Sequence, residues 1–471
     1  MTATSYDRVV YPTGVFAQTH PDRLAVAAKL FGLDPVDPAK SRILEIGGGN
    51  SMNLISIASA WPECEAHGFD LSESAIAMGQ QYVDAAELSN VHLAVDDIRE
   101  AHKRYPAKSF DYVIAHGVYA WVEPDVARAL MELVGHVLSD RGAAIISYNC
   151  FPGGHARMIM REMIEAETEG IDDLQQRLGA MRRFLEQYAP DQPNDTPLVR
   201  VLREHARFML GRTDGSIYHD ELNEVFLPQY LAHVVAEAKD CGLRYLTDAA
   251  RGCLLEGFVR DDQVRSDDPD SQVLRAAVRN DYRTLRYFRQ TIFVRSEQVP
   301  DRRSDVNRAS GLHLSTPLKR QEDGSFLLGS EKVDIYSPEL ASAIESAAAN
   351  SPQRTPVSEI AKTPEHLRTV LRMHSDWYVN LHNAPAPFAA EPGEYPETCP
   401  LGRAMLRMGD SSIATLNHLL LRLDRPEMRA LLRAADGTKT VSELAELGHG
   451  IPPDKIAEAL GLAAKDALLV R

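Results

Sequence analysis

The sequence predicts an α/β protein that is built on a mostly parallel sheet, and three observations support this fold class. An apolar run at residues 42–46 leads into the turn Gly47-Gly48-Gly49 and then into a helix from about Met52 to Ala60. A second strand ends in Asp70, 23 residues after Gly47. Strands and helices then alternate to about residue 148, which favours parallel pairing with right-handed crossovers.

The glycine turn predicts a binding site for a nucleotide-like cofactor. Glycines between a strand and a helix let backbone N–H groups approach a ligand and direct the helix N-terminus at it. Asp70 stands where such a fold offers a carboxylate to a ribose diol. The sequence motif of nicotinamide- and flavin-binding proteins needs a third small residue at the position that Met52 occupies. The sequence therefore does not match that motif.

The remaining pattern, Glu45 followed by Gly47 and Gly49, resembles motif I of class I S-adenosylmethionine (SAM) methyltransferases. The resemblance implies SAM as the cofactor and a Rossmann-like sheet of seven strands. It also implies that the glycines pass under the methionine part of SAM. Glu45 would then contact the amino group, and Asp70, with Leu71 beside it, would hold the ribose.

The next two strands carry residues for the rest of the cofactor. Residues 91–95 alternate as a strand that leads to Asp97 and Ile98, where the resemblance implies contact with the adenine. Residues 110–115 form the fourth strand, and His116 follows it beside the expected position of the methyl group. A helix at about 124–138 and a strand at 143–148 come next. Ligands of parallel sheets bind at the carboxyl ends of the strands, where these residues converge.

A narrower resemblance covers nearly the whole chain. Segments 5–11, 19–21, 117–122, 148–155, 218–230 and 286–291 are similar to bacterial methyltransferases that carry a methyltransferase regulatory domain. The protein-lysine methyltransferases that modify outer-membrane proteins of Rickettsia share this architecture. The resemblance implies that Tyr11 belongs to a lid over SAM. Gly154 departs from the family, which usually has tryptophan there, so we expect a wider acceptor pocket.

The acceptor pocket is expected where the fourth and fifth strands end. Tyr119 and Trp121 follow the fourth strand, and aromatic faces at that place would stabilise a cation. Tyr148 and Asn149 end the fifth strand and could orient an acceptor through hydrogen bonds. His155, like His116, is a candidate base. These positions predict the catalytic part of the site.

Length and composition predict several domains. A chain of 471 residues is too long for a single core. We expect a SAM-binding domain at 1–155 and a mainly helical regulatory segment at 156–300, whose strand at 288–295 returns to the catalytic sheet. A linker at 301–333 and a tandem winged-helix-like region at 334–471 would follow, because residues 355–361 and 439–445 look like copies of one repeat. Its place after a linker predicts a role in acceptor choice and not in cofactor binding.

Charge and cysteine usage narrow the partners and the compartment. The net charge of −16 argues against a nucleic-acid partner. Arg283, Arg286, Arg289 and Arg295 are spaced as the solvated face of a helix. The sequence contains no run of about eighteen apolar residues, so we expect no transmembrane helix. Five single cysteines without metal-ligand spacing favour a cytoplasmic protein with no metal site.

The sequence therefore predicts a SAM-dependent methyltransferase, and three functional readings are open. The favoured one is N-methylation of an amine on a protein or peptide, with a lysine-type acceptor, because the extra domains could present a macromolecule. The alternative is a small-molecule N- or O-methyltransferase in a biosynthetic pathway. A non-catalytic SAM-binding protein is disfavoured because the cofactor motifs are intact. The chain could also form oligomers.

Overall fold

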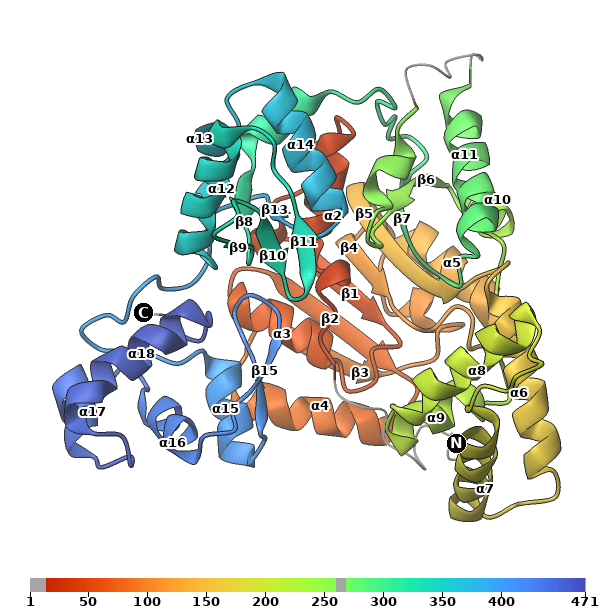
Figure 1. Ribbon diagram of the computed structural model, residues 1–471, viewed down its shortest axis with the longest axis horizontal. Helices are drawn as coiled ribbons and strands as arrows, with labels where there is room; N and C mark the ends of the chain where they lie inside the picture. The colour runs from red at the N-terminus through yellow and green to blue at the C-terminus, as the bar shows by residue number, and fades with distance from the viewer. Residues whose placement is uncertain (1–13, 260–267, 471) are drawn as a thin grey trace.

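The computed structural model describes residues 14–259 and 268–470 (Figure 1). A central sheet, drawn mainly in red and orange, occupies the middle of the molecule. Yellow-green helices lie at its lower right, and the last part of the chain, in teal and blue, lies along its left side. Tyr11, which we expected in a lid, falls outside the described residues.

The central sheet has seven strands in the order β3-β2-β1-β4-β5-β7-β6, so the predicted Rossmann-like sheet is confirmed. Among these strands, β7 alone runs in the direction opposite to the other six. It is the segment that was predicted to return to the catalytic sheet. The strands are β1 (Arg42–Ile46), β2 (Glu65–Asp70), β3 (Val91–Val95), β4 (Phe110–Ala115), β5 (Leu138–Asn149), β6 (Leu243–Asp248) and β7 (Phe288–Arg295).

Both faces of the sheet are covered. Successive side chains of a strand point to opposite faces, so Ile43 lies in one core and Leu44 in the other. The helices α2 (Pro21–Leu30), α3 (Met52–Ala60) and α4 (Glu73–Ala85) contribute to the first core. The helices α5 (Pro124–Val137), α10 (Leu231–Asp240) and α11 (Pro269–Thr284) contribute to the second. Burial on both faces accounts for the nearly continuous apolar strands.

A helical segment with its own small core follows β5. It contains α6 (Gly154–Thr168), α7 (Leu174–Tyr188), α8 (Pro197–Leu210) and α9 (Asp214–Glu221). The chain turns between α6 and α7. Gly170 has a φ of +73° there, and the Asp173 side chain caps α7. Residues 189–196 separate α7 from α8.

The predicted solvated arginine face is wrong for three of its four residues, since Arg295 also lies in β7 and its side chain is only 12% exposed. Leu285 ends α11 with a φ of +49°, so the helical spacing stops before Arg286. Arg289 lies in β7 with no exposed surface, and its guanidinium pairs with Asp248 at 3.0 Å and with Asp281 at 2.7 Å. Arg286 joins the same network through Glu256 and Asp281.

The segment 301–333, for which we expected a linker, is folded. It holds the 3₁₀ helix η6 (Val306–Gly311) and four short strands, and β8 is the central strand of a small sheet. The four strands are β8 (His313–Ser315), β9 (Lys319–Arg320), β10 (Phe326–Leu328) and β11 (Glu331–Val333). The 3₁₀ helix and β8 place the start of the C-terminal region before residue 334.

The C-terminal region contains two groups of helices and short strands. In the first unit β8 pairs with β12 and β13; in the second, residues 397 and 398 pair with 436 and 469. The first unit contains α12 (Pro338–Asn350), β12 (Thr355–Pro356), α13 (Val357–Ile360), α14 (Pro364–Ser375) and β13 (Asn380–His382). The second contains α15 (Pro400–Met408), β14 (Ser412–Ala414), β15 (Leu420–Arg422), α16 (Pro426–Ala434), α17 (Val441–Glu446) and α18 (Ile456–Lys465).

The C-terminal region shares a core with the catalytic sheet. One continuous apolar cluster contains side chains from α2, α3 and both C-terminal units. The buried Asp22 on α2 accepts hydrogen bonds from the His382 ring at 2.8 Å and from the Asn383 N–H at 2.8 Å. Tyr82 on α4 donates to Asp410 at 3.1 Å. These contacts tie the C-terminal units directly to the elements around the glycine turn.

The sequence predicted no membrane-spanning segment and single cysteines without metal-ligand spacing. Each helix within 14–259 and 268–470 is too short or too polar to cross a bilayer. All five cysteines are unpaired. Burial raises the pKa of Cys64 and of Cys150 to about 12, because it disfavours the thiolate, so both are inert thiols at neutral pH.

Candidate functional site

The glycine turn after β1 leaves no room for a side chain at Gly47 or Gly48. Gly47 and Gly49 have φ angles of +65° and +57°, a region that favours glycine. A Cβ on Gly47 would lie 2.6 Å from the Val118 side chain, and one on Gly48 would lie 2.5 Å from Oε2 of Glu45. The turn is therefore a bare backbone cradle at the N-terminus of α3, as the glycine pattern predicted.

Glu45 offers a carboxylate oxygen inside this cradle. Its side chain is buried, and Oε1 accepts a hydrogen bond from the Asn53 amide at 2.7 Å. Oε2 is also buried and has no hydrogen-bond partner in the described part of the chain. Burial raises the pKa of Glu45 to about 7. An unpartnered buried carboxylate oxygen fits a cationic amino group, so these residues suit the methionine end of SAM.

Asp70 ends β2 at the same edge of the sheet. One carboxylate oxygen accepts the Gly49 N–H at 2.8 Å, and the other accepts the Ser72 N–H at 2.9 Å. These bonds hold the carboxylate beside the glycine turn. The next residue, Leu71, is 47% exposed and can cover one side of a bound ligand.

Asp97 and Ile98 follow β3. The Asp97 carboxylate pairs with Arg99 at 2.6 Å, and this hydrogen bond holds the pKa of Asp97 below its usual range. Ile98 is half-buried against the second core. The predicted cofactor residues after β1, β2 and β3 thus lie along one edge of the sheet.

His116 follows β4 at this edge. Its Nδ1 is buried without a hydrogen-bond partner among the described residues, and burial lowers its pKa to about 4. The ring lies 4.3 Å from the Phe16 ring and 6.1 Å from the Phe288 ring, measured between centroids. Asn149, at the end of β5, stands opposite Phe288 in the β5–β7 register. We call Phe16, His116, Asn149 and Phe288 the edge cluster.

Phe16 and Phe288 were missed in the sequence. Phe288 could have been found, because a returning antiparallel strand begins at the edge where the parallel strands end. The Phe16 backbone N–H donates to Asn53 Oδ1 at 2.8 Å. Nothing local in the sequence connects Phe16 with Asn53.

Two tyrosines predicted at the acceptor pocket are core residues. Tyr119 is buried, and its hydroxyl donates to Glu237 on α10. Tyr148 has no exposed surface, and its hydroxyl lies 3.0 Å from Thr291 Oγ1 on β7. Both hydroxyls are therefore engaged within the fold, and a contact of either tyrosine with an acceptor stays a prediction.

The other residues predicted for the acceptor pocket are Trp121, Gly154 and His155. Trp121 and Gly154 are packed against neighbouring side chains, and His155 is exposed. Trp121 packs on Phe226, and the Arg157 guanidinium already lies 5.1 Å from its ring centre. A Cβ on Gly154 would lie 3.0 Å from Pro228, so this glycine does not widen a pocket. His155 is exposed on α6 and stacks on Phe151. Of the predicted catalytic residues, Asn149 alone belongs to the edge cluster.

His418 reaches the cofactor edge from the second C-terminal unit. The fully buried ring contacts Asn53 Oδ1 through Nε2 at 3.0 Å and Ser56 Oγ through Nδ1 at 3.0 Å. Asn53 Oδ1 can only accept, so Nε2 carries the proton and Nδ1 accepts from Ser56. A chain of hydrogen bonds therefore runs from His418 through Asn53 to Glu45. No sequence motif pointed to this contact.

Comparisons with known proteins match this architecture. A family described as "Methyltransferase domain" matches residues 43–142, and one described as "Predicted methyltransferase regulatory domain" matches residues 213–295. Uncharacterized protein RP028 of Rickettsia prowazekii is 32% identical over 236 residues, which are 50% of this chain and 94% of the relative. Uncharacterized protein RP789 of the same organism is 30% identical over 297 residues; this is 62% of the chain but 53% of RP789.

The fold is shared with a solved structure along almost its full length. PKMT2 from Rickettsia typhi superposes with a TM-score of 0.82 at 21% identity, covering 98% of this chain and 100% of that one. Its complex with AdoHcy superposes with a TM-score of 0.79 at 20% identity and the same coverage. The matched families, the strand order and the glycine cradle all indicate a SAM-dependent methyltransferase. The chain belongs to the class I SAM-dependent methyltransferases that carry a methyltransferase regulatory domain.

Proposed function

We propose that this enzyme transfers the methyl group of SAM to an amine of a lysine-type side chain on a protein or peptide. The observation that carries the proposal is the edge cluster, in which Phe16 and Phe288 flank His116 beside the end of β4. Aromatic faces stabilise the cationic product of amine methylation. The likeness of the fold to the Rickettsia PKMT2 structures supports a macromolecular acceptor.

Our proposal gives each cofactor residue a role. When bound, SAM supplies an electrophilic methyl group on a sulfonium. Gly47 and Gly49 bring their backbone close to its methionine part, and Glu45 Oε2 accepts from its ammonium group. Asp70 and Leu71 hold the ribose, while Asp97 and Ile98 contact the adenine.

The edge cluster would align and desolvate the acceptor. An amine must lose its proton before it attacks, and an apolar surrounding lowers the pKa of an amine. His116 is neutral at physiological pH, so it adds no positive charge that would repel the acceptor. Asn149 can hold the amine through its side-chain amide. In-line placement of donor and acceptor can contribute about 7–11 kcal/mol to lowering the barrier.

A labelled-methyl experiment tests the proposed acceptor class. The enzyme would be incubated with labelled SAM and a cell lysate that is separated into protein and small-molecule fractions. Label in the protein fraction, on lysine by mass spectrometry, is the expected result, with a rate that rises through alkaline pH. Label in small molecules alone would overturn the proposed acceptor and favour the alternative small-molecule methyltransferase. The family assignment would stand in either case.

Asp70→Ala is expected to weaken SAM binding. The variant loses the ribose hydrogen bonds to a charged carboxylate, which are worth about 1.5–3 kcal/mol. It also frees the Gly49 and Ser72 N–H groups that the carboxylate now orients. Calorimetry with SAM measures the change, and Asp70→Asn, which keeps one acceptor oxygen, should lose less. Unchanged affinity in Asp70→Ala would remove Asp70 from the site.

SAM affinity is expected to rise with pH up to about pH 7 because of Glu45. The pKa of its carboxyl in the free enzyme is about 7, so at lower pH Glu45 is protonated. Binding an ammonium group then requires release of that proton. Affinity should fall by up to about tenfold per pH unit well below the pKa. Calorimetry between about pH 5.5 and pH 7 measures this slope, and Glu45→Gln should abolish it; an equal slope in that variant would contradict the assignment.

A further inference from the structure

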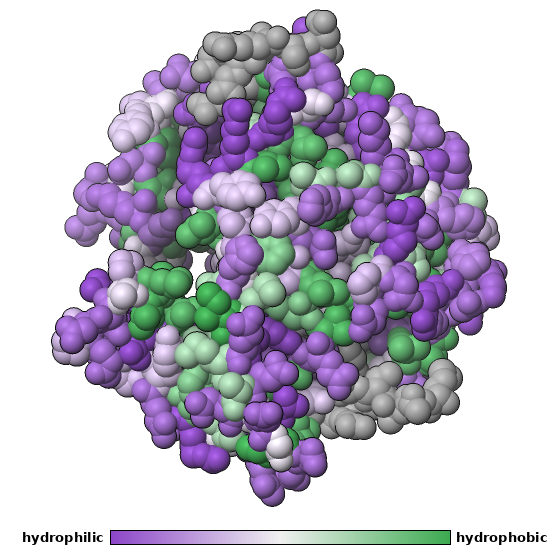
Figure 2. All heavy atoms as spheres, turned by 90° about the vertical axis from the view of Figure 1, so that its right-hand side faces the viewer, coloured by the Kyte–Doolittle hydropathy of each residue, from purple (hydrophilic) through white to green (hydrophobic). Residues whose placement is uncertain are grey.

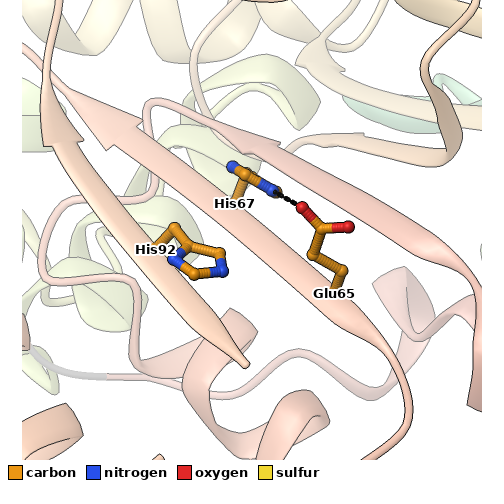
Figure 3. Close-up of side chains that lie close together, drawn as sticks. All are labelled: Glu65, His67 and His92. Atoms are coloured by element: carbon orange, nitrogen blue, oxygen red, sulfur yellow. Dashed lines mark hydrogen bonds and ion pairs between the residues drawn. The ribbon is translucent and has the colours of Figure 1, made fainter. Parts of the chain in front are cut away.

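Two histidines and one carboxylate meet on the cofactor half of the sheet, away from the site described above (Figure 3). Glu65 and His67 are two residues apart on β2, so their side chains share one face. His92 on β3 stands opposite His67 in the parallel register. The three side chains offer ligand atoms that all lie within 4.8 Å of one another.

The three side chains are the kinds of ligand that a divalent ion of intermediate softness, such as zinc, prefers. Imidazole nitrogen and carboxylate oxygen are the ligands that zinc and similar ions take from proteins. His67 Nε2 lies 2.7 Å from Glu65 Oε1, which is a hydrogen-bond distance. Two ligand atoms on a tetrahedral zinc-class ion are about 3.3 Å apart, so the two side chains would have to separate slightly to bind an ion.

Binding of an ion by Glu65, His67 and His92 requires a proton shift on His67 and small side-chain movements. His67 must shift its proton from Nε2 to Nδ1, so that Nε2 can bind the ion while the imidazole stays neutral. His92 is exposed and free to turn toward the other two, and its ring centroid is already 4.8 Å from that of His67. Arg42 holds Glu65 Oε2 at 3.0 Å and steadies the carboxylate. The same guanidinium charge will weaken cation binding.

We propose that Glu65, His67 and His92 bind a zinc-class divalent ion, with water in the remaining positions. The ion would join the edge strand β3 to β2. Asp70 lies at the end of β2, and Asp97 follows β3, so the ion would fix the spacing of the two strands that precede the ribose and adenine residues. The proposal does not depend on the proposed acceptor.

Cobalt absorption tests the proposed site without any assay of activity. The full chain, free of metal and of any histidine tag, would be titrated with Co²⁺ and then with Zn²⁺. The expected result is a saturable visible absorption from one bound Co²⁺ that Zn²⁺ abolishes by displacement. His92→Ala removes an exposed ligand without disturbing the core and should bind Co²⁺ at least about tenfold more weakly.

His102→Ala is the matched control, because His102 is exposed on the 3₁₀ helix η3 (Ala101–Lys103) and is not part of the cluster. It should bind Co²⁺ as the wild type does. Zn²⁺ should also raise the melting temperature of the wild type and of His102→Ala, but not of His92→Ala. Absorption that does not saturate, or equal affinity of His92→Ala and the wild type, would overturn the site.

Discussion

A chain that ends after Gly311 is expected to lose its fold, and with it the binding of SAM. The sequence alone led us to expect the opposite, since the C-terminal region seemed to follow a linker. In the structure, the apolar faces of α2, α3 and α4 pack against β13 and α15. Exposing a buried apolar side chain costs about 1.5–3 kcal/mol. A handful of such side chains equals the whole stability of a typical domain, about 5–15 kcal/mol.

Circular dichroism and calorimetry with SAM would check this truncation. A folded, SAM-binding fragment 1–311 would show that the catalytic sheet is independent of the C-terminal units. The point variant His418→Ala tests the same coupling in a folded protein. It leaves Asn53 Oδ1 without one of its donors and Glu45 less firmly held, so SAM should bind more weakly. His382→Ala, which breaks the contact with Asp22 away from Asn53, is the matched control for loss of a buried histidine.

Arg289→Ala is expected to lower the free energy of unfolding by about 3–5 kcal/mol. The substitution leaves the buried carboxylates of Asp248 and Asp281 short of a positive charge, since Arg286 is then the sole arginine in the network. Burial of an uncompensated charge is among the costliest changes in a core. Urea denaturation followed by circular dichroism measures the loss.

Arg283→Ala is the control for Arg289→Ala. Arg283 is exposed on α11, so its loss should change the free energy of unfolding by no more than about 0.5 kcal/mol. Similar destabilisation in the two variants would show that the buried network contributes nothing beyond a surface arginine. The network also positions Phe288, which directly precedes Arg289, so partial loss of turnover in Arg289→Ala is expected even where the protein stays folded.

The cofactor half of the site could be predicted because its determinants are local. The sequence shows these determinants within about thirty residues: glycines where φ is positive, a buried strand before them and an acid at the end of the next strand. Parallel strands bring their carboxyl ends to one edge of the sheet, so these residues lie close together in the fold. Glu45, Asp70 and His116 therefore lie along the edge that the sequence indicated.

The acceptor half is harder to predict from the sequence because its residue pattern is ambiguous. Aromatic residues after the fourth and fifth strands could face a ligand or the core, and the sequence does not tell which. The packing of α10 and β7 decided this question, since Glu237 and Thr291 engage the hydroxyls of Tyr119 and Tyr148. The helical spacing of Arg286 and Arg289 misled in the same way, because Leu285 ends the helix between Arg283 and these residues.

By itself, the sequence determined the class of fold, the alternation of strands and helices up to β5 and the return of β7. These follow from periodicity, glycine placement and chain order. Only the tertiary structure decided that Phe16 and Phe288 flank His116, that His418 reaches Asn53, and that Glu65, His67 and His92 meet. Each of these groups is assembled from distant segments by strand register or by a shared core, and such contacts leave no local pattern in the chain.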